Sequence, residues 1–90
     1  VDKAKETSYS QVYNEACKQM MNKMSKVEPT GSVDKDFLEE MIPHHEGAVK
    51  MATNILNYTN NEELREIATH MISGQQRQLE EMKRLLKTVK

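Results

Sequence analysis

The pattern of apolar and polar positions predicts three amphipathic helices. Apolar residues recur every three or four positions in three separate stretches of the chain, which is the spacing of one helical face. No stretch shows the strict alternation of a half-buried strand. We therefore expect an all-α chain with helices at about 9–27, 34–57 and 61–88, in a single domain over residues 1–90.

Local signals mark the expected helix ends. Ser8 to Gln11 fits a capping box for the first helix, and a similar box pairs Asn60 with Glu63 before the third. The stretch Glu28–Ser32 breaks the first helix, and Ser32 or Asp34 is expected to cap the second. Residues 1–7 are polar, so we expect them to be frayed.

Short connections predict an up-down bundle of three helices, which a second copy could complete by dimerisation. Counting along alternating helices gives an approximate register. On this count, residues of the first and second helices lie at the same height along the bundle in these pairs: Met24 with Phe37, Met20 with Met41, and Cys17 with His44. The third helix would return past the same levels with Met82, Gln78 and Gln75. Sulfur and imidazole groups from different helices are therefore expected near one end of the bundle.

The composition argues against several classes of function and structure. The net charge is −1, with acidic and basic residues interspersed, so no basic stripe predicts nucleic-acid binding. No apolar run approaches the ~18 residues that a membrane span needs. The single cysteine, Cys17, excludes an internal disulfide. Seven methionines, against one phenylalanine and no tryptophan, are unusually many for so small a core.

The stretch from Met41 to Ala52 carries the most distinctive chemistry. It holds two of the three histidines and places Pro43, where we expect a bend, inside a predicted helix. Thioether and imidazole donors together favour Cu(I) among biological metals. The register gives a candidate Cu(I) site of Met20, Met24, Met41, His44 and His45, with Met21, Met51, Met71 and Met82 in reserve.

Structural explanations compete with each of these assignments. A methionine on a helix stripe is more often core filler than a metal ligand. The paired histidines could equally make hydrogen bonds to neighbours, while His70 is expected in solvent and Cys17 as a small buried apolar side chain. Di-iron chemistry would need matched Glu-x-x-His pairs, which are absent. No general acid–base pair is evident, so we do not expect an enzyme.

Three stretches also carry a family resemblance. They are Asp34-x-Asp36-Phe37-Leu38-x-x-Met41-Ile42-Pro43-His44-His45-x-Gly47-Ala48-Val49-x-Met51-Ala52, then Met20-Met21-x-x-Met24 before Thr30-Gly31, and Ile72-x-x-Gln75 followed by Leu79 and Met82. The first resembles the core motif of a bacterial family called domain of unknown function 305. The other two are similar to parts of its first and third helices.

The resemblance implies an exported, ferritin-like helical bundle, periplasmic or secreted, in a family where some members bind copper through Met and His. It also implies metal roles for Met20 or Met21, Met24, Met41, His44, His45 and Met51. Met21 stands where the family often has His, which makes this donor set softer. The expected partners are a copper ion, a copper-transfer protein and a second copy of the chain.

Two questions stay open from the sequence. Helical spacing groups His45 with Met41 and His44 with Met51, on opposite edges of one stripe. The stretch therefore serves two metal sites, which we favour, or one site assembled by a bend at Pro43. The expected function is Cu(I) buffering, transfer or tolerance in the cell envelope. The alternative is a metal-independent interaction module acting as a homodimer.

Overall fold

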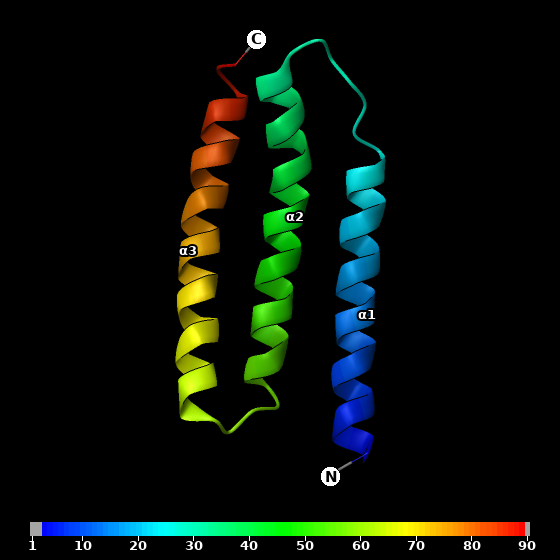
Figure 1. The fold of residues 1–90 in the computed structure, drawn as a ribbon, viewed down its shortest axis with the longest axis vertical. Helices are drawn as coiled ribbons and strands as arrows, with labels where there is room; N and C mark the ends of the chain where they lie inside the picture. Colours follow the sequence, from blue (N-terminus) through cyan, green and yellow to red (C-terminus); the bar gives the residue numbers. More distant parts are fainter. Residues whose placement is uncertain (1–2, 90) are drawn as a thin grey trace.

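Three long helices account for most of the chain. The computed structural model describes residues 3–89 and contains α1 (Lys3–Ser25), α2 (Val33–Leu56) and α3 (Glu62–Leu86). Successive helices run in opposite directions (Figure 1), and no strand occurs within the described range. The all-α, three-helix prediction is therefore confirmed. None of the helices in residues 3–89 is both long and apolar enough to cross a membrane.

The helices lie side by side in one flat layer. α2 is in the middle and packs against both neighbours, whereas no contact joins α1 to α3 within residues 3–89 (Figure 1). The molecule measures 50 × 24 × 13 Å, and its radius of gyration is 15.5 Å. A compact domain of this length would have a radius of gyration of about 12 Å. The fold is thus an open three-helix arrangement in which α2 has two helical neighbours.

The first helix begins earlier than the sequence predicts. α1 starts at Lys3, so residues 3–7 are helical rather than frayed and Ser8 does not cap the helix; residues 1 and 2 lie outside the described range. Lys, Ala and Glu in this segment are strong helix formers, which outweighs the capping signal. α1 also ends two residues early, at Ser25, where bonds spanning three residues close its last turn.

The other helix ends follow the expected chemistry. Ser32 caps α2 by accepting a hydrogen bond from the Lys35 backbone N–H at 3.3 Å. Asn61, one residue after the predicted cap, accepts from Leu64 N–H at 3.0 Å and starts α3. α2 continues through Pro43 without interruption. Each cap satisfies a helix N–H that would otherwise lack a partner.

Contacts between helices set a register that differs from the sequence-based count. Met20 packs on Gly47 rather than lying level with Met41, a displacement of six residues or about 9 Å along the helix. On the other side, Gln78 meets His45 rather than lying level with Met41. The expected register between α1 and α2 is therefore wrong by more than one turn.

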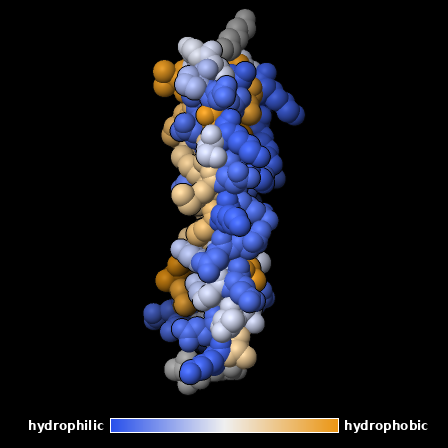
Figure 2. All heavy atoms as spheres, turned by 90° about the vertical axis from the view of Figure 1, so that its right-hand side faces the viewer, coloured by the Kyte–Doolittle hydropathy of each residue, from blue (hydrophilic) through white to orange (hydrophobic). Residues whose placement is uncertain are grey.

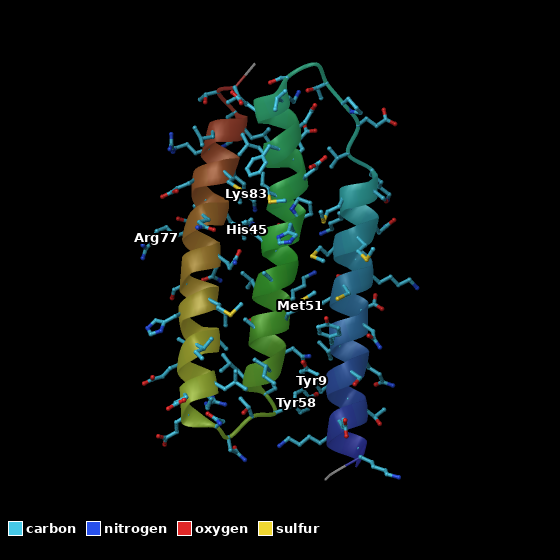
Figure 3. The ribbon with its side chains drawn as sticks, in the orientation of Figure 1. Tyr9, His45, Met51, Tyr58, Arg77 and Lys83 are labelled. Atoms are coloured by element: carbon cyan, nitrogen blue, oxygen red, sulfur yellow. The ribbon has the colours of Figure 1, made fainter. Side chains whose placement is uncertain are left out.

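The flat arrangement leaves a thin core. The buried apolar residues of the described part of the chain are Ala16, Leu38, Ala52 and Ala68, and no large side chain there is fully enclosed. A ring cluster closes the opposite end of the α1–α2 pair from their connecting loop: Tyr9 lies edge-on to Tyr58 at 5.8 Å between ring centroids (Figure 3). Each helix buries only the sides that face a neighbour, because nothing within residues 3–89 covers the layer from above or below.

The two broad faces of the layer differ in polarity. Helical periodicity places Glu46, Lys50 and Thr53 of α2 on one face, and Glu46 meets Lys83 of α3 there at 3.6 Å. Seen edge-on, hydrophobic side chains gather mainly along the opposite side (Figure 2). We call this side the apolar face. It contains Tyr13, Cys17, Met20 and Met24 of α1; Phe37, Met41, His44, Ala48, Met51 and Ile55 of α2; and Ile67, Met71, Gly74, Gln78 and Leu85 of α3.

Candidate functional site

The predicted metal ligands fall on or beside the apolar face. Helical periodicity turns five of them toward this side of the layer, on α1 and α2, while Met21 lies at its margin and His45 faces α3. They lie within or level with residues 41–51 of α2, a length of about 15 Å. The set consists of Met20, Met21, Met24, Met41, His44, His45 and Met51.

The line of contact between α1 and α2 holds the first group of donors. A Cβ atom added to Gly47 would lie 2.7 Å from the sulfur of Met20, so the missing side chain makes room for that sulfur. Counting from this contact along antiparallel helices, Met24 lies level with Pro43. His44 and Met51 flank Gly47 at about one turn on either side, and Met51 lies on the α1 side of α2 (Figure 3). We call Met20, Met24, His44 and Met51 the α1–α2 group.

His45 occupies the other side of α2, facing α3. Its Nδ1 lies 3.0 Å from the Met41 carbonyl oxygen, and its Nε2 lies 2.7 Å from Oε1 of Gln78. A carbonyl only accepts, so Nδ1 carries a proton and donates. In the neutral tautomer Nε2 then has a lone pair, and its hydrogen bond with Gln78 requires the side-chain amide of Gln78 to be turned so that its NH₂ group donates, because the amide oxygen only accepts. A backbone carbonyl holding Nδ1–H is the arrangement that orients many metal-binding histidines.

The two histidines are close but face different surroundings. Their ring centroids are 5.9 Å apart and the rings are inclined at 57°. His45 is half-buried between α2 and α3, whereas His44 is exposed on the apolar face. The structure thus places His45 beside Met41, and His44 on the same side of α2 as Met51. Gln78 takes up Nε2 of His45, so a metal ion at this nitrogen would have to displace the Gln78 side chain.

The remaining candidates are dispersed. Met21 is 65% exposed at the margin of the apolar face, and His70 lies exposed on α3. Met71 and Met82 lie on α3, away from the α1–α2 group. Within residues 3–89, no three His, Cys, Asp or Glu side chains gather as a metal-binding cluster. The donors that do converge are therefore mainly thioethers.

A tyrosine–cysteine pair on α1 was missed by sequence reasoning. The side chains of Tyr13 and Cys17, one turn apart, share a hydrogen bond that raises the pKa of Tyr13 above its ordinary value of 10.0. The negative charge of Cys17 in its thiolate form acts in the same direction on the pKa of Tyr13. Tyr9 also stacks on Tyr13 with 6.2 Å between centroids. The four-residue spacing was the available signal for this contact.

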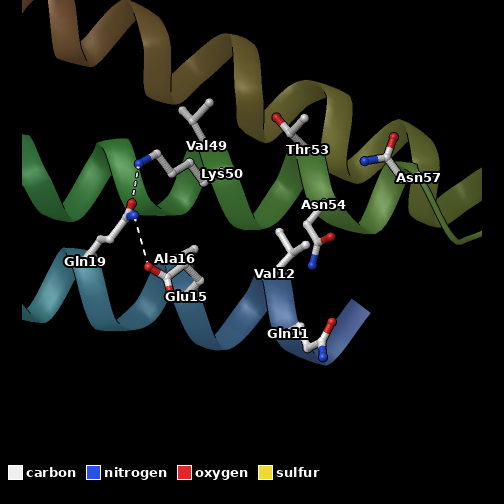
Figure 4. A pocket seen from close by; sticks show the side chains of 10 residues that line it. All are labelled: Gln11, Val12, Glu15, Ala16, Gln19, Val49, Lys50, Thr53, Asn54 and Asn57. Atoms are coloured by element: carbon white, nitrogen blue, oxygen red, sulfur yellow. Dashed lines mark hydrogen bonds between the residues drawn. The ribbon is translucent and has the colours of Figure 1, made fainter. Parts of the chain in front are cut away.

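The polar side of the α1–α2 contact carries a groove of about 530 Å³ (Figure 4). Val12, Ala16 and Val49 provide much of its apolar lining. At one end Lys50 donates to Oε1 of Gln19 at 2.9 Å, and Gln19 in turn donates to Glu15 at 3.3 Å. This chain of polar contacts bridges the two helices and explains how an exposed lysine helps to fix their register.

Asn54 lines the same groove and is 98% buried, which its position in the sequence did not indicate. Its Nδ2 donates to the Tyr9 carbonyl at 3.1 Å, while its Oδ1 has no hydrogen-bond partner among the described residues. The amide links the last turn of α2 to the N-terminal part of α1. Its role is therefore in positioning the two helices that carry the α1–α2 group.

Comparisons with known proteins agree with the motif. Residues 2–86 match the family described as "Domain of unknown function (DUF305)". A stretch of 53 residues, 59% of the chain, is 40% identical to "Uncharacterized protein L153" of Acanthamoeba polyphaga mimivirus. That stretch spans 35% of the viral protein's length, so the two proteins share one segment. The family match covers nearly the whole chain, and the chain therefore belongs to the DUF305 family.

Proposed function

We propose that this protein binds Cu(I) through Met and His side chains on its apolar face. The observation that carries the proposal is the gathering of five such donors, from two helices, along about 15 Å of one face, with Met21 and His45 beside it. Thioether sulfur is a soft, neutral ligand, and with imidazole it favours Cu(I) over Ca²⁺, Mg²⁺ or a structural Zn²⁺.

The donor chemistry and the packing fit this ion. The Met20 sulfur sits over Gly47, where no side chain competes for the space. Met24, His44 and Met51 would complete the α1–α2 group. Methionine binds without losing a proton, so Cu(I) would enter and leave with little proton exchange. Such a site suits buffering, transfer or tolerance better than catalysis.

The arrangement favours two ions rather than one. His44 belongs to the α1–α2 group, whereas His45 faces α3 beside Met41, and its Nε2 is held by Gln78. We propose that the α1–α2 group binds the first ion. His45 and Met41 would bind a second, weaker one because Gln78 must move. His44 and Met21 are exposed in a single copy of the chain, so a copper-transfer protein could reach the metal directly there.

The resemblance to exported, copper-binding relatives supports a role in the cell envelope, periplasmic or secreted. This location is a proposal that rests on the resemblance alone. Fractionating cells that express the full-length gene product would test it. Recovery in the cytoplasmic fraction would contradict the proposal, whatever the metal content.

Metal analysis of the purified protein tests the binding proposal. Cells would be grown in copper-supplemented medium, and the protein purified anaerobically. We expect about two copper atoms per chain, falling to at most one when Met20, Met24 and Met51 are replaced by Leu. Met71→Leu and His70→Ala serve as matched controls that retain the copper. Wild-type protein without copper would contradict the proposal.

A second candidate function, a metal-independent interaction module acting as a homodimer, is favoured by a separate observation. Phe37 and Ile67 on the apolar face are both more than half exposed. Exposed apolar side chains of this size favour a packing partner on the face, whether or not copper binds.

A further inference from the structure

The protein has one layer of helices where most domains have two. Stable domains bury the apolar side of each helix or sheet against a second layer. Here α1 and α3 each pack only against the edges of α2, and within residues 3–89 no element lies over the apolar face (Figures 1 and 2). The hydrophobic side of the layer is therefore left without a partner.

The side chains on this face are unusually exposed for their size. Phe37 is 56% exposed, Ile67 55%, Met71 45% and Leu85 40%. Scattered exposed apolar residues are common in monomers, but a continuous apolar surface usually marks an interaction site. All four share one broad face: Ile67, Met71 and Leu85 extend along α3, and Phe37 lies near the start of α2.

The total surface supports the same conclusion. The chain exposes 6668 Å². A folded monomer of 10.4 kDa would expose about 5,400 Å² by the usual scaling with mass. The excess of about 1,300 Å² exceeds the ~800 Å² that each partner contributes to an interface of standard size. The broad face, 50 Å by 24 Å, has a projected area of about 1,200 Å², which is large enough for such an interface.

The composition of the face allows two copies of it to pack against each other. The residues that define it include no Asp, Glu, Lys or Arg. By helical periodicity the nearest carboxylates, Glu6, Glu40 and Glu81, lie at its ends and edges, so the centre of a face-to-face contact would bring no like charges together. Ala48 and Gly74 are small residues near mid-length of their helices, and a Cβ added to Gly74 would meet no atom within 4 Å. The middle of the face can therefore approach a flat partner closely.

From these observations we infer that a second copy of this chain packs on the apolar face, giving a two-layer, six-helix dimer. Symmetric association of one patch with itself is the commonest form of assembly in soluble proteins. Burial of apolar surface drives the association, so it does not depend on bound metal. The proposal is thus independent of the copper proposal, although the methionine donors lie on the same face.

Sedimentation equilibrium of metal-free protein tests this inference. We expect a mass near 20.8 kDa, twice that of the chain, at micromolar concentration. The thermal unfolding midpoint should rise with protein concentration, because dissociation accompanies unfolding. A 10.4 kDa species at all concentrations up to the millimolar range would overturn the inference and point to a different protein or segment as the occupant.

Paired substitutions identify the face. Phe37→Lys with Ile67→Lys should raise the dimer dissociation constant roughly a hundredfold or more, since each lysine would have to lose its hydration. Thr53→Lys, on the polar side, is the matched control and should leave the dimer intact. A milder pair, Phe37→Ser with Ile67→Ser, replaces the lysine pair should the latter fail to fold. A dimer that persists in a helical variant of either pair would contradict the assignment of this face.

Discussion

The sulfur of Met20 lies against Gly47, and this contact fixes how α1 and α2 align. A Cβ at Gly47 would come within 2.7 Å of the sulfur and within 3.0 Å of Cβ and Cγ of Met20. The close approach therefore involves the base of the Met20 side chain as well as its flexible end. The same contact places Met24 level with Pro43 and so assembles the α1–α2 group.

The first prediction concerns this contact. Gly47→Ala should destabilise the protein by about 1–2 kcal/mol, because the cost of overpacking exceeds the gain in helix propensity. Gly74→Ala is the matched control. Its new methyl group meets open space in a single copy, so the variant should be up to about 1 kcal/mol more stable. Urea unfolding at concentrations that favour the monomer gives both values, and equal effects at the two sites would contradict the Met20–Gly47 packing.

The second prediction concerns the hydrogen bond between His45 and Gln78. Gln78→Leu frees Nε2 of His45 while keeping a side chain of similar length. Because a hydrogen bond contributes about 0.5–1.5 kcal/mol, we expect the weaker copper ion to bind roughly 2- to 10-fold more tightly. Anaerobic titration of both proteins gives the second binding constant. The control, Gln76→Leu, should leave it unchanged, and weaker binding in Gln78→Leu would show that Gln78 assists the site.

The third prediction is a pH dependence that separates histidine from methionine ligands. Protons compete with Cu(I) for imidazole as the pH falls below neutrality, whereas thioethers take up no protons. The copper affinity of the wild type should therefore decrease between pH 7 and pH 5. The His44→Ala/His45→Ala variant should bind less copper, with an affinity that changes little over this range. The same pH slope in both proteins would exclude histidine from the sites.

The fourth prediction concerns the α1 pair that lies beside the site. Because its hydrogen bond with Cys17 raises the pKa of Tyr13, Cys17→Ala should lower that pKa toward the ordinary value. The absorbance of the tyrosinate gives the titration in a Tyr9→Phe/Tyr58→Phe background, where Tyr13 is the only tyrosine. An unchanged pKa would show that the two side chains do not interact.

The helices were predictable because their signals are local. Apolar spacing located all three, and Ser32 was correctly identified as a cap, since its hydroxyl bonds a backbone N–H three residues away. The predicted start of α1 was wrong because helix propensity in residues 3–7 outweighed the capping box at Ser8. The contact of His45 with Met41 also followed from local spacing, which fixes angular position on a helix, and the pairing of His44 with Met51 stays a prediction from the same spacing.

The alignment of neighbouring helices was not predictable in the same way. Periodicity gives the direction of a side chain around the axis but no displacement along it, so the register between α1 and α2 was off by six residues. Gly47 was the available clue, since a helical glycine often marks a close approach. Asn54 was missed because an amide in a polar sequence context gives no sign of burial. The single-layer arrangement depends on contacts among three helices, which no local pattern encodes.

Competition for Cu(I) with a chelator under anaerobic conditions tests the central claim most directly. Wild-type protein should withdraw copper from the chelator, and replacing Met41, His44 and His45 with Ala should reduce the number of ions bound. Met20→Leu with Met24→Leu should weaken the tighter ion by at least about tenfold, while Met71→Leu and His70→Ala compete as the wild type does. A wild type that competes no better than the Met41→Ala/His44→Ala/His45→Ala variant would contradict the account.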